Sequence, residues 1–418
     1  MVGVRRPQAV RAILVVPAVV ALAVGSSLVA APAAAAPPTP DTMTERDVDR
    51  LVGDVSRLPF LQPVDLGVPA PSSWAERISD RGVVIGHAWG ADERYHAFRW
   101  EAGTAVLLPE EGYGSTAVDV NARGQVVGSI ATADGRLRTV LWEPDGTVVD
   151  IAVPPEHTVP WDLDDHGRVA VNWHDADTGL PRAAVWQDGE LTLLGDLGGG
   201  TSQVAGEGAL NERGEVTGTA VTADDRRRAF VWRDGVMTVL PAPAAADAYA
   251  AAITRRGVVV GQIDDPVGRS GHVVWEDGPL RFLDLQAGYL VDVNDRGVVA
   301  GNVPTGDGTS RGIVADRRGS TRLPTLGGRS GGTSALNDLG VVVGWAERRG
   351  DTTPHPVAWV LGVPVPLGQH VPGVVVRGGM AFDINDRGQV VGHVQPVTGP
   401  GPSDVTQRAV LWELVPRR

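Results

Sequence analysis

A short phrase recurs eight times along the chain and limits the fold more than any other feature. Each copy has an apolar residue, most often Asn or Asp next, two further residues, Gly, and a largely β-branched run. The copies are ISDRGVVIG (78–86), VNARGQVVG (120–128), LDDHGRVAV (163–171), LNERGEVTG (210–218), ITRRGVVVG (253–261), VNDRGVVAG (293–301), LNDLGVVVG (336–344) and INDRGQVVG (384–392). Their first glycines are 40 to 48 residues apart. Such a period is typical of propellers and other repeat architectures.

Each phrase predicts a β-hairpin. The Asn or Asp side chain can accept hydrogen bonds from backbone amides ahead of it, and the Gly three residues later supplies the positive φ of a short hairpin loop. The run that follows, such as residues 83–85, is apolar at consecutive positions. We therefore expect the second strand of each hairpin to be covered on both faces.

Two further strands complete each repeat. A strand ending in Trp follows the hairpin in seven of the eight copies, and the sixth copy ends at Ala315 instead. A turn such as EPDG or RDG then leads to a fourth strand, for example at residues 147–151 and 237–241. Four strands in about 43 residues are the unit of a propeller blade, and the recurrent Trp is expected to pack between blades.

The two ends of the repeat region indicate how the ring closes. The eighth copy stops after Trp412 without a fourth strand, whereas an extra segment that matches the fourth-strand pattern, LQPVDLG (61–67), precedes the first copy. We predict an all-β fold over residues 61–418: an eight-bladed β-propeller of four-stranded blades, closed by an N-terminal strand that completes the last blade. Seven blades, a parallel β-helix and an open array are the alternatives.

The first 36 residues have the pattern of a cleaved secretory signal. Three arginines precede an apolar stretch at residues 12–24, and Ala34–Ala36 forms a small-residue cleavage site. The stretch is shorter than the roughly 20 residues of a membrane anchor. Residues 37–60 are predicted to be a linker with a short helix at Met43–Arg57. We expect a secreted, extracellular protein, exported by the general secretory or the twin-arginine route.

The net charge and the absence of cysteine argue against several kinds of binding partner and site. The net charge is −13 and there is no cysteine, so nucleic acid, anionic lipid, disulfides and thiolate metal sites are all disfavoured. The histidines lack a close metal-binding spacing. His87 and His393, at matching positions of adjacent blades, are a weaker candidate pair for a metal than for ordinary strand ends. We expect a monomer without cofactor or metal.

The order of the motifs resembles the HAF-repeat family of extracellular proteins. HAFRW (96–100), LPTLGGRSGGTSALNDLGVVVG (323–344) and LLGDLGGGTSQVAGEGALNERGEVTG (193–218) carry the likeness, which covers residues 61–412. The resemblance implies a β-propeller-like repeat architecture and transfers no activity, cofactor or catalytic residue. His96 keeps the motif's histidine, while other copies have Arg or Ala near that position, which favours a structural role.

Candidate binding residues are those that break the repeat. Five positions before the turn Asx, where most copies are small or aliphatic, the chain has large side chains, and other aromatic residues are expected in nearby loops. The predicted ligand-binding residues are Trp74, Tyr113, Trp161, Tyr249, Tyr289 and Met380, with His157 in the same class of loop. Exposed aromatic side chains at the mouth of a propeller can stack on sugars or peptides, or simply fill the channel.

No motif in the sequence specifies a reaction, so any catalytic residues remain unassigned. We favour a binding or scaffold module that recognises an extracellular glycan or peptide through aromatic loops on one face. The alternative is a propeller-type hydrolase or lyase acting on extracellular polysaccharide, which would need converging carboxylates. Glu110, Glu111 and Glu156 lie in suitable loops for that chemistry.

Overall fold

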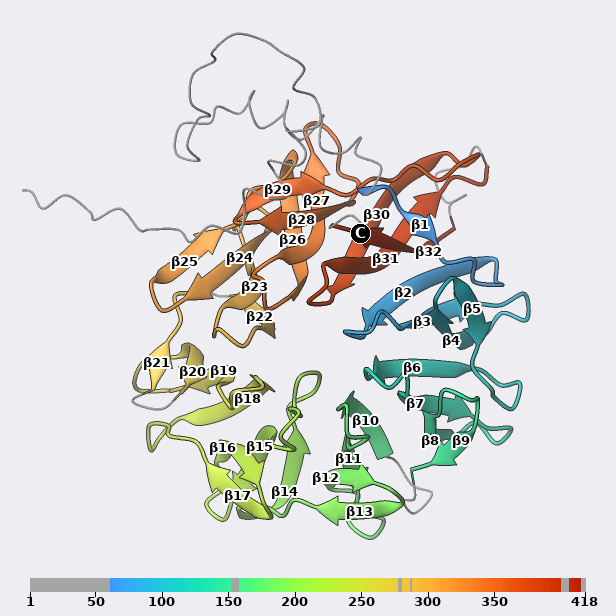
Figure 1. Cartoon of the computed structure of the whole chain (residues 1–418). Helices are drawn as coiled ribbons and strands as arrows, with labels where there is room; N and C mark the ends of the chain where they lie inside the picture. Colours follow the sequence, from blue (N-terminus) through green and yellow to red (C-terminus); the bar gives the residue numbers. More distant parts are fainter. Residues whose placement is uncertain (1–60, 152–157, 277–279, 286–287, 400–405, 415–418) are drawn as a thin grey trace, which may run out of the picture.

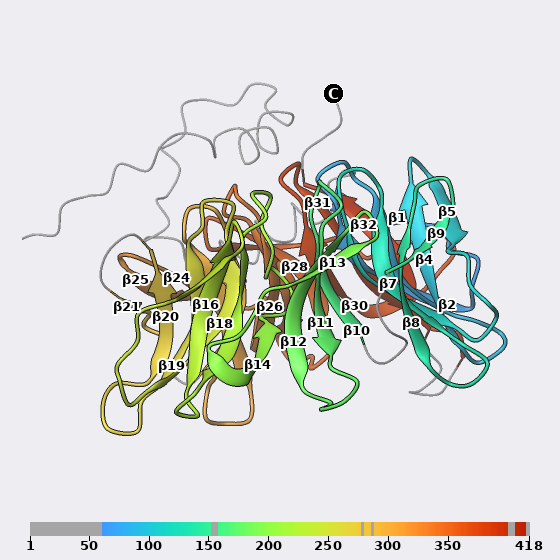
Figure 2. The same ribbon diagram turned by 90° about the horizontal axis from the view of Figure 1, so that it is seen from below.

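The computed structural model describes residues 61–151, 158–276, 280–285, 288–399 and 406–414. The strands of these residues form eight four-stranded antiparallel sheets. Figure 1 shows the sheets as the blades of a closed ring, and Figure 2 shows their strands running between the two faces of that ring. The predicted eight-bladed β-propeller is confirmed. The predicted signal, linker and short helix lie outside the described residues.

The first four blades follow the chain in order, and the first strand of each lies nearest the ring axis (Figure 1). They consist of β2 (Ser72–Ile78), β3 (Val84–Trp89), β4 (Tyr95–Glu101) and β5 (Thr104–Leu107); β6 (Ser115–Val120), β7 (Val126–Ala131), β8 (Leu137–Trp142) and β9 (Val148–Asp150); β10 (Thr158–Leu163), β11 (Val169–His174), β12 (Pro181–Gln187) and β13 (Glu190–Leu193); and β14 (Gly198–Val204), β15 (Val216–Thr222), β16 (Arg227–Arg233) and β17 (Val236–Val239).

The last four blades continue the same order until the final one, which takes a strand from the start of the chain. They consist of β18 (Asp247–Ile253), β19 (Val259–Asp264), β20 (Gly271–Trp275) and β21 (Arg281–Phe282); β22 (Tyr289–Val293), β23 (Val299–Pro304), β24 (Ser310–Asp316) and β25 (Gly319–Arg322); β26 (Gly327–Leu336), β27 (Val342–Arg348), β28 (His355–Val360) and β29 (Val363–Pro366); and β30 (Val376–Ile384), β31 (Gln389–Pro396), β32 (Arg408–Glu413) and β1 (Val64–Asp65).

The predicted closure is confirmed at blade 8. Strand β1 pairs antiparallel with β32, with Val64 opposite Leu411, and Figure 1 shows this blue strand beside the dark red one. The amide of Leu66 extends the pairing by donating to the carbonyl of Ala409 over 3.0 Å. Leu61 and Leu66 are both 2% exposed. The strand is shorter than the predicted segment, but buried leucines anchor it, and it covers the edge that blade 8 would otherwise expose.

Four of the recurrent Trp residues, Trp142, Trp275, Trp359 and Trp412, join their blade to the one before it by a hydrogen bond. Trp142, Trp359 and Trp412 are fully buried. The indole N–H of Trp142 donates to the carbonyl of Pro109 over 2.8 Å, in the loop that leaves blade 1. Trp359 and Trp412 make the equivalent bonds over 2.7 Å to blades 6 and 7. Packing between blades is therefore their role, as the repeat pattern predicts.

The Asx–Gly turns form the predicted hairpins and also link blades. At the turn of blade 2, Asn121 Oδ1 accepts from the amides of Arg123 and Gln125, both over 3.0 Å, and Gly124 has a φ of 80°. The Asn121 side chain then donates to the carbonyl of Asp164 on blade 3 over 2.9 Å. We call the face that carries these turns the turn face. The opposite face, with the hairpins between second and third strands and the connections between blades, is the loop face.

Within the described residues, no helix combines the length and the apolar character that a membrane crossing requires.

Candidate functional site

Four aspartates near the ring axis connect neighbouring blades. Asp119 follows a β-bulge in β6, and its carboxylate accepts from the amide of Val120 over 2.8 Å and from that of Leu163 on blade 3 over 2.8 Å. The same pattern joins three other blades to the next one in the ring. These four residues, which we call the junction aspartates, are Asp119, Asp162, Asp292 and Asp383. Their first duty is structural, because each carboxylate satisfies backbone donors on two blades.

Two of the junction aspartates lie near the guanidinium of Arg77. Arg77 on blade 1 reaches across to Glu207 on blade 4. Burial alone would lower the pKa of Arg77, but the surrounding carboxylates, Glu207 first, raise it. Burial followed by the charge of Asp119 raises the pKa of Asp162 well above its ordinary value, and burial raises that of Asp292 to about 7. Burial and the crowding of carboxyls at the axis therefore favour their protonated forms.

A second ring of charge lies at the axis on the turn face. Arg255 forms ion pairs with the carboxylates of Asp295, Asp338 and Asp386, which come from blades 6, 7 and 8. The amide of Asp338 also donates to Asp386 over 2.8 Å. These contacts line a depression of about 330 Å³. The acidic side chains are thus occupied by Arg255 and by backbone amides.

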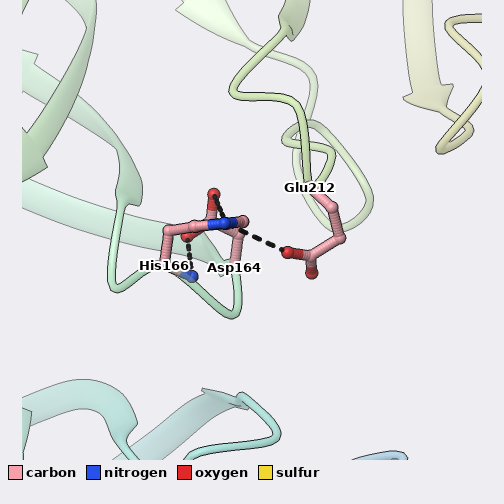
Figure 3. A group of neighbouring side chains, drawn as sticks. All are labelled: Asp164, His166 and Glu212. Carbon is pink, nitrogen blue, oxygen red and sulfur yellow. Dashed lines mark hydrogen bonds and ion pairs between the residues drawn. The ribbon is translucent and has the colours of Figure 1, made fainter.

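One group of side chains on this face has the composition of a metal site. Figure 3 shows Asp164, His166 and Glu212 at the turns of blades 3 and 4, with His166 Nδ1 lying 3.5 Å from Glu212 and 3.9 Å from Asp164. The Asp164 carboxylate already accepts from two turn amides and from the guanidinium of Arg168. Arg168 supplies the positive charge that a metal would bring, so turn chemistry accounts for the group.

The loop face carries a different kind of site between blades 1 and 2. It is a depression of about 420 Å³, which we call the blade 1/2 hollow. Its lining residues are Trp89, Glu93, Arg94, Tyr95, Tyr113, Gly114, Ser115, Thr116, Ser129, Ala131 and Leu137. Among these, Tyr95 is 49% exposed and Tyr113 is 44% exposed. Large aromatic side chains left open to solvent in a depression are typical of ligand sites.

A chain of ring contacts supports the wall of the hollow. Trp89 and Tyr95 face each other across β3 and β4, with ring centroids 4.7 Å apart. Trp74, on β2, meets Tyr95 edge-on at 5.7 Å, and its indole N–H donates to Glu76 over 2.7 Å. His87 lies on the other side of Trp74 at 5.6 Å. This packing holds the exposed Tyr95 ring in place.

The six predicted binding residues do not share one site. Tyr113 lines the blade 1/2 hollow and Trp74 supports it. Four others lie elsewhere around the ring: Trp161 on blade 3, Tyr249 on blade 5, Tyr289 on blade 6 and Met380 on blade 8. The expected loop position of Trp161 is wrong, because this residue lies within β10 where the register shifts, beside Asp162. His157 falls outside the described residues.

The carboxylates suggested for hydrolysis are engaged in ion pairs with side chains of blades 1 and 2. Glu110 accepts from His96 Nδ1 over 2.9 Å, and Asp92 binds the other ring nitrogen over 2.9 Å. Glu111 pairs with Arg138 over 2.8 Å. Burial lowers the pKa of His96, but Asp92 and Glu110 raise it on balance, so the two carboxylates favour the charged form of the ring. Glu156 lies outside the described residues.

The two matching histidines, His87 and His393, have separate surroundings. His87 Nδ1 lies 3.1 Å from Glu76, within blade 1. His393 is 2% exposed and packs on Phe382 at 5.3 Å. Burial lowers the pKa of His393 to about 4, which keeps it neutral at physiological pH. Each imidazole therefore belongs to the packing of its own blade.

Sequence inspection missed Trp89, Tyr95 and Leu137, although a signal for them was present. Trp89 and Tyr95 flank the β3–β4 hairpin as a cross-strand pair, and Ala131 and Leu137 are their counterparts in blade 2. The aromatic pair Trp89 and Tyr95 therefore departs from the repeat, as do the large side chains that stand five positions before the turn Asx.

Comparison with known proteins finds structural likeness at low sequence identity. No protein-family model and no curated protein matches the chain. Among solved structures, the β-propeller domain of the Trilobed protease from Pyrococcus furiosus is 10% identical, with a TM-score of 0.46 over 62% of this chain and 86% of that one. A puromycin-hydrolyzing peptidase from Mycobacterium tuberculosis is 14% identical, with a TM-score of 0.49 over 86% of this chain and 60% of that one. TolB from Acinetobacter baumannii is 13% identical, with a TM-score of 0.35 over 70% and 78%.

At these identities the likeness concerns the fold alone, and the peptidase activity belongs to the matched protein. The class defined by the fold is a closed, eight-bladed β-propeller. Within this propeller, the blade 1/2 hollow is a depression lined by Trp89, Tyr95 and Tyr113.

Proposed function

We propose that the chain is an exported, extracellular binding or scaffold module of the HAF-repeat type, which recognises a glycan or peptide through aromatic side chains of its loop face. The proposal includes a monomeric protein that acts without a cofactor. It rests on one observation. Trp89, Tyr95 and Tyr113, from two neighbouring blades, converge on a single open depression.

The placement of the charged residues favours binding over hydrolysis. The junction aspartates accept backbone amides, and Glu110 and Glu111 hold His96 and Arg138. A hydrolase needs a carboxyl that is free to give or take a proton beside the substrate. The acids suggested for that role are engaged between blades instead, and the aromatic side chains are open.

A binding screen with matched variants tests this function. Protein immobilised through its C-terminus would be exposed to an array of glycans and peptides, alongside the Trp89→Ala, Tyr113→Ala and Tyr289→Ala variants. We expect the first two to lose binding, because each removes part of the wall of the hollow. Tyr289→Ala should bind as wild type, since Tyr289 is 63% exposed on blade 6, well away from the hollow.

Equal loss in all three variants would extend the site to the wider set of aromatic residues. Undiminished binding by Trp89→Ala and Tyr113→Ala would refute the assignment of the hollow. Circular dichroism and thermal unfolding of each variant would verify that the fold is retained.

A further inference from the structure

We infer that the blade 1/2 hollow takes a neutral sugar residue of a glycan, an inference that rests on the binding function proposed above. Three properties of the hollow carry it: the arrangement of its rings, the state of its backbone groups and the balance of its charges.

The rings leave apolar faces next to hydroxyl groups. Trp89 and Tyr95 meet edge to face at 65°, so they do not stack on each other, and Tyr95 remains 49% exposed. Ser115 and Ser129, from β6 and β7, line the floor. A sugar ring has C–H groups on its faces and hydroxyls around its rim, and it therefore matches aromatic walls with polar groups between them.

Several backbone groups around the hollow are already paired. Gly90 donates to Arg94 over 2.9 Å within the β3–β4 hairpin, and Ala131 donates to Gly114 over 2.8 Å between β7 and the chain before β6. Strand β4 is paired with β3 on one side and with β5 on the other. An extended peptide gains most of its affinity from free main-chain donors and acceptors at a strand edge. The hollow offers side chains instead, which favours a sugar over a peptide.

The charged side chains that line the hollow are one acid, Glu93, and one base, Arg94, so their formal charges balance. The guanidinium of Arg94 donates to the carbonyl of Gly112 and lies 5.5 Å from the centre of the Tyr113 ring. Arg94 thus shapes the wall, and the neighbouring carboxylate of Glu93 disfavours a carboxylate or sulfate group at the same place. The chain as a whole carries a net charge of −13, which repels acidic polymers. A neutral sugar fits both conditions.

Titration calorimetry on the full chain tests the inference. The probes are neutral cello-, xylo-, manno- and N-acetylchito-oligosaccharides, oligogalacturonate as an acidic glycan, and a library of aromatic and aliphatic tripeptides. We expect a neutral oligosaccharide to bind, and its affinity to change less than about twofold between 0.15 and 1 M NaCl, because no ion pair contributes. Tyr113→Ala should weaken binding about tenfold or more, whereas Tyr113→Phe should stay within about threefold because it keeps the ring face.

The outcomes separate this inference from the function on which it rests. Binding of peptides or oligogalacturonate that Tyr113→Ala abolishes, with no neutral sugar bound, would overturn the sugar assignment and leave the binding function intact. Neutral-sugar binding that both Tyr113 variants and Tyr95→Ala leave unchanged would overturn the hollow as the site. Failure of every probe class to bind would count against the sugar assignment and the binding function together.

Discussion

Blade 1 has two neighbours, and the comparison of its two junctions shows where the repeat is constrained and where it is free. At the junction with blade 8, Asp383 accepts from the amide of Ile78 over 2.8 Å. The side chain of Asn385 donates to the carbonyl of Ser79 over 3.0 Å. Both bonds come from residues at fixed repeat positions, and they fasten the two ends of the chain into a ring.

At the junction with blade 2, the residues at those same repeat positions are Arg77 and Ser79. Arg77 extends across the axis to Glu207 on blade 4. Ser79 Oγ accepts from the amide of Val83 in its own turn over 3.1 Å. The side chains that fasten blade 8 to blade 1 are therefore replaced here by ones that point elsewhere, and the loop face of this junction holds the blade 1/2 hollow.

Under the proposed function, one junction of blade 1 fastens the ring and the other binds the ligand. Where Asp and Asn occupy their repeat positions, the polar groups of the blades satisfy one another. Departures from the repeat accumulate around blade 1, which contributes Trp74, Trp89 and Tyr95 as well as Arg77. The aromatic side chains among these departures are the ones that we propose for ligand binding.

The largest effect is expected from removing the strand that closes the ring. A chain beginning at residue 68 lacks β1 and the buried Leu61 and Leu66. We expect its free energy of unfolding to be about 4–8 kcal/mol below that of a chain beginning at residue 61, since apolar burial and main-chain bonds are both lost. Urea unfolding of the two chains measures the difference. Matching midpoints would contradict the account of closure.

The pH dependence of stability tests the crowding of carboxyls at the axis. Burial raises the pKa of Asp292 to about 7, while an aspartate in the unfolded chain titrates near pH 3.9. Between these values the folded protein keeps a proton that the unfolded chain has released. Asp292 should therefore make the free energy of unfolding fall as pH rises from about 4 to above 7, by an amount on the order of 2–4 kcal/mol.

Asp292→Asn should flatten this part of the pH profile, because an amide does not titrate. Asp177→Asn, in an exposed hairpin of blade 3, is the matched control and should leave the slope unchanged. Urea unfolding at pH 5, 6, 7 and 8 measures the profiles. Parallel profiles for wild type and Asp292→Asn would show that Asp292 has an ordinary affinity for protons.

A smaller effect distinguishes the two junctions of blade 1. Asn385→Ala removes the bond to Ser79 and the bonds to the amides of Arg387 and Gln389 in its own turn. It should cost about 2–3 kcal/mol, whereas Ser79→Ala should cost less than about 1 kcal/mol because it breaks one local bond. Thermal unfolding compares them. A larger loss from Ser79→Ala would reverse the assignment of the two junctions.

The smallest expected effect is a gain in stability. Ser79→Asn restores the usual turn residue, and the new amide should reach the carbonyl of Asn121, as Asn121 itself reaches Asp164 on the next blade over 2.9 Å. We expect an increase of about 0.5–1 kcal/mol in the free energy of unfolding. Binding at the hollow should be unaffected, because the turn lies on the opposite face. A loss of stability would show that junction 1/2 cannot accept the repeat residue.

The fold was predictable because its determinants are local. An Asx residue followed three positions later by Gly defines a hairpin wherever it occurs, and Gly124 and Gly388 both adopt a positive φ near 80°. Counting the strands in each repeat was enough to find the strand missing after Trp412 and the extra segment at Leu61–Gly67. Neither step required knowledge of how one blade meets the next.

The site was harder to predict because it depends on contacts between blades. Asp119 and Asp383 stand two residues before the turn Asx, a pattern visible in the sequence, but their role appears only when a β-bulge turns each carboxylate toward the next blade. Likewise, Tyr113 and Tyr95 are 18 positions apart on different blades. The two side chains converge only because blades 1 and 2 pack side by side. The sequence candidates therefore included Tyr113 but not Trp89 or Tyr95.

The most direct test of the account is a crystal structure of the protein bound to the neutral oligosaccharide that binds best in solution. The account predicts that a sugar ring occupies the blade 1/2 hollow, in contact with Tyr95 and Tyr113 and within reach of Trp89. A well-defined sugar on another blade or at the ring axis, with the hollow open, would contradict it.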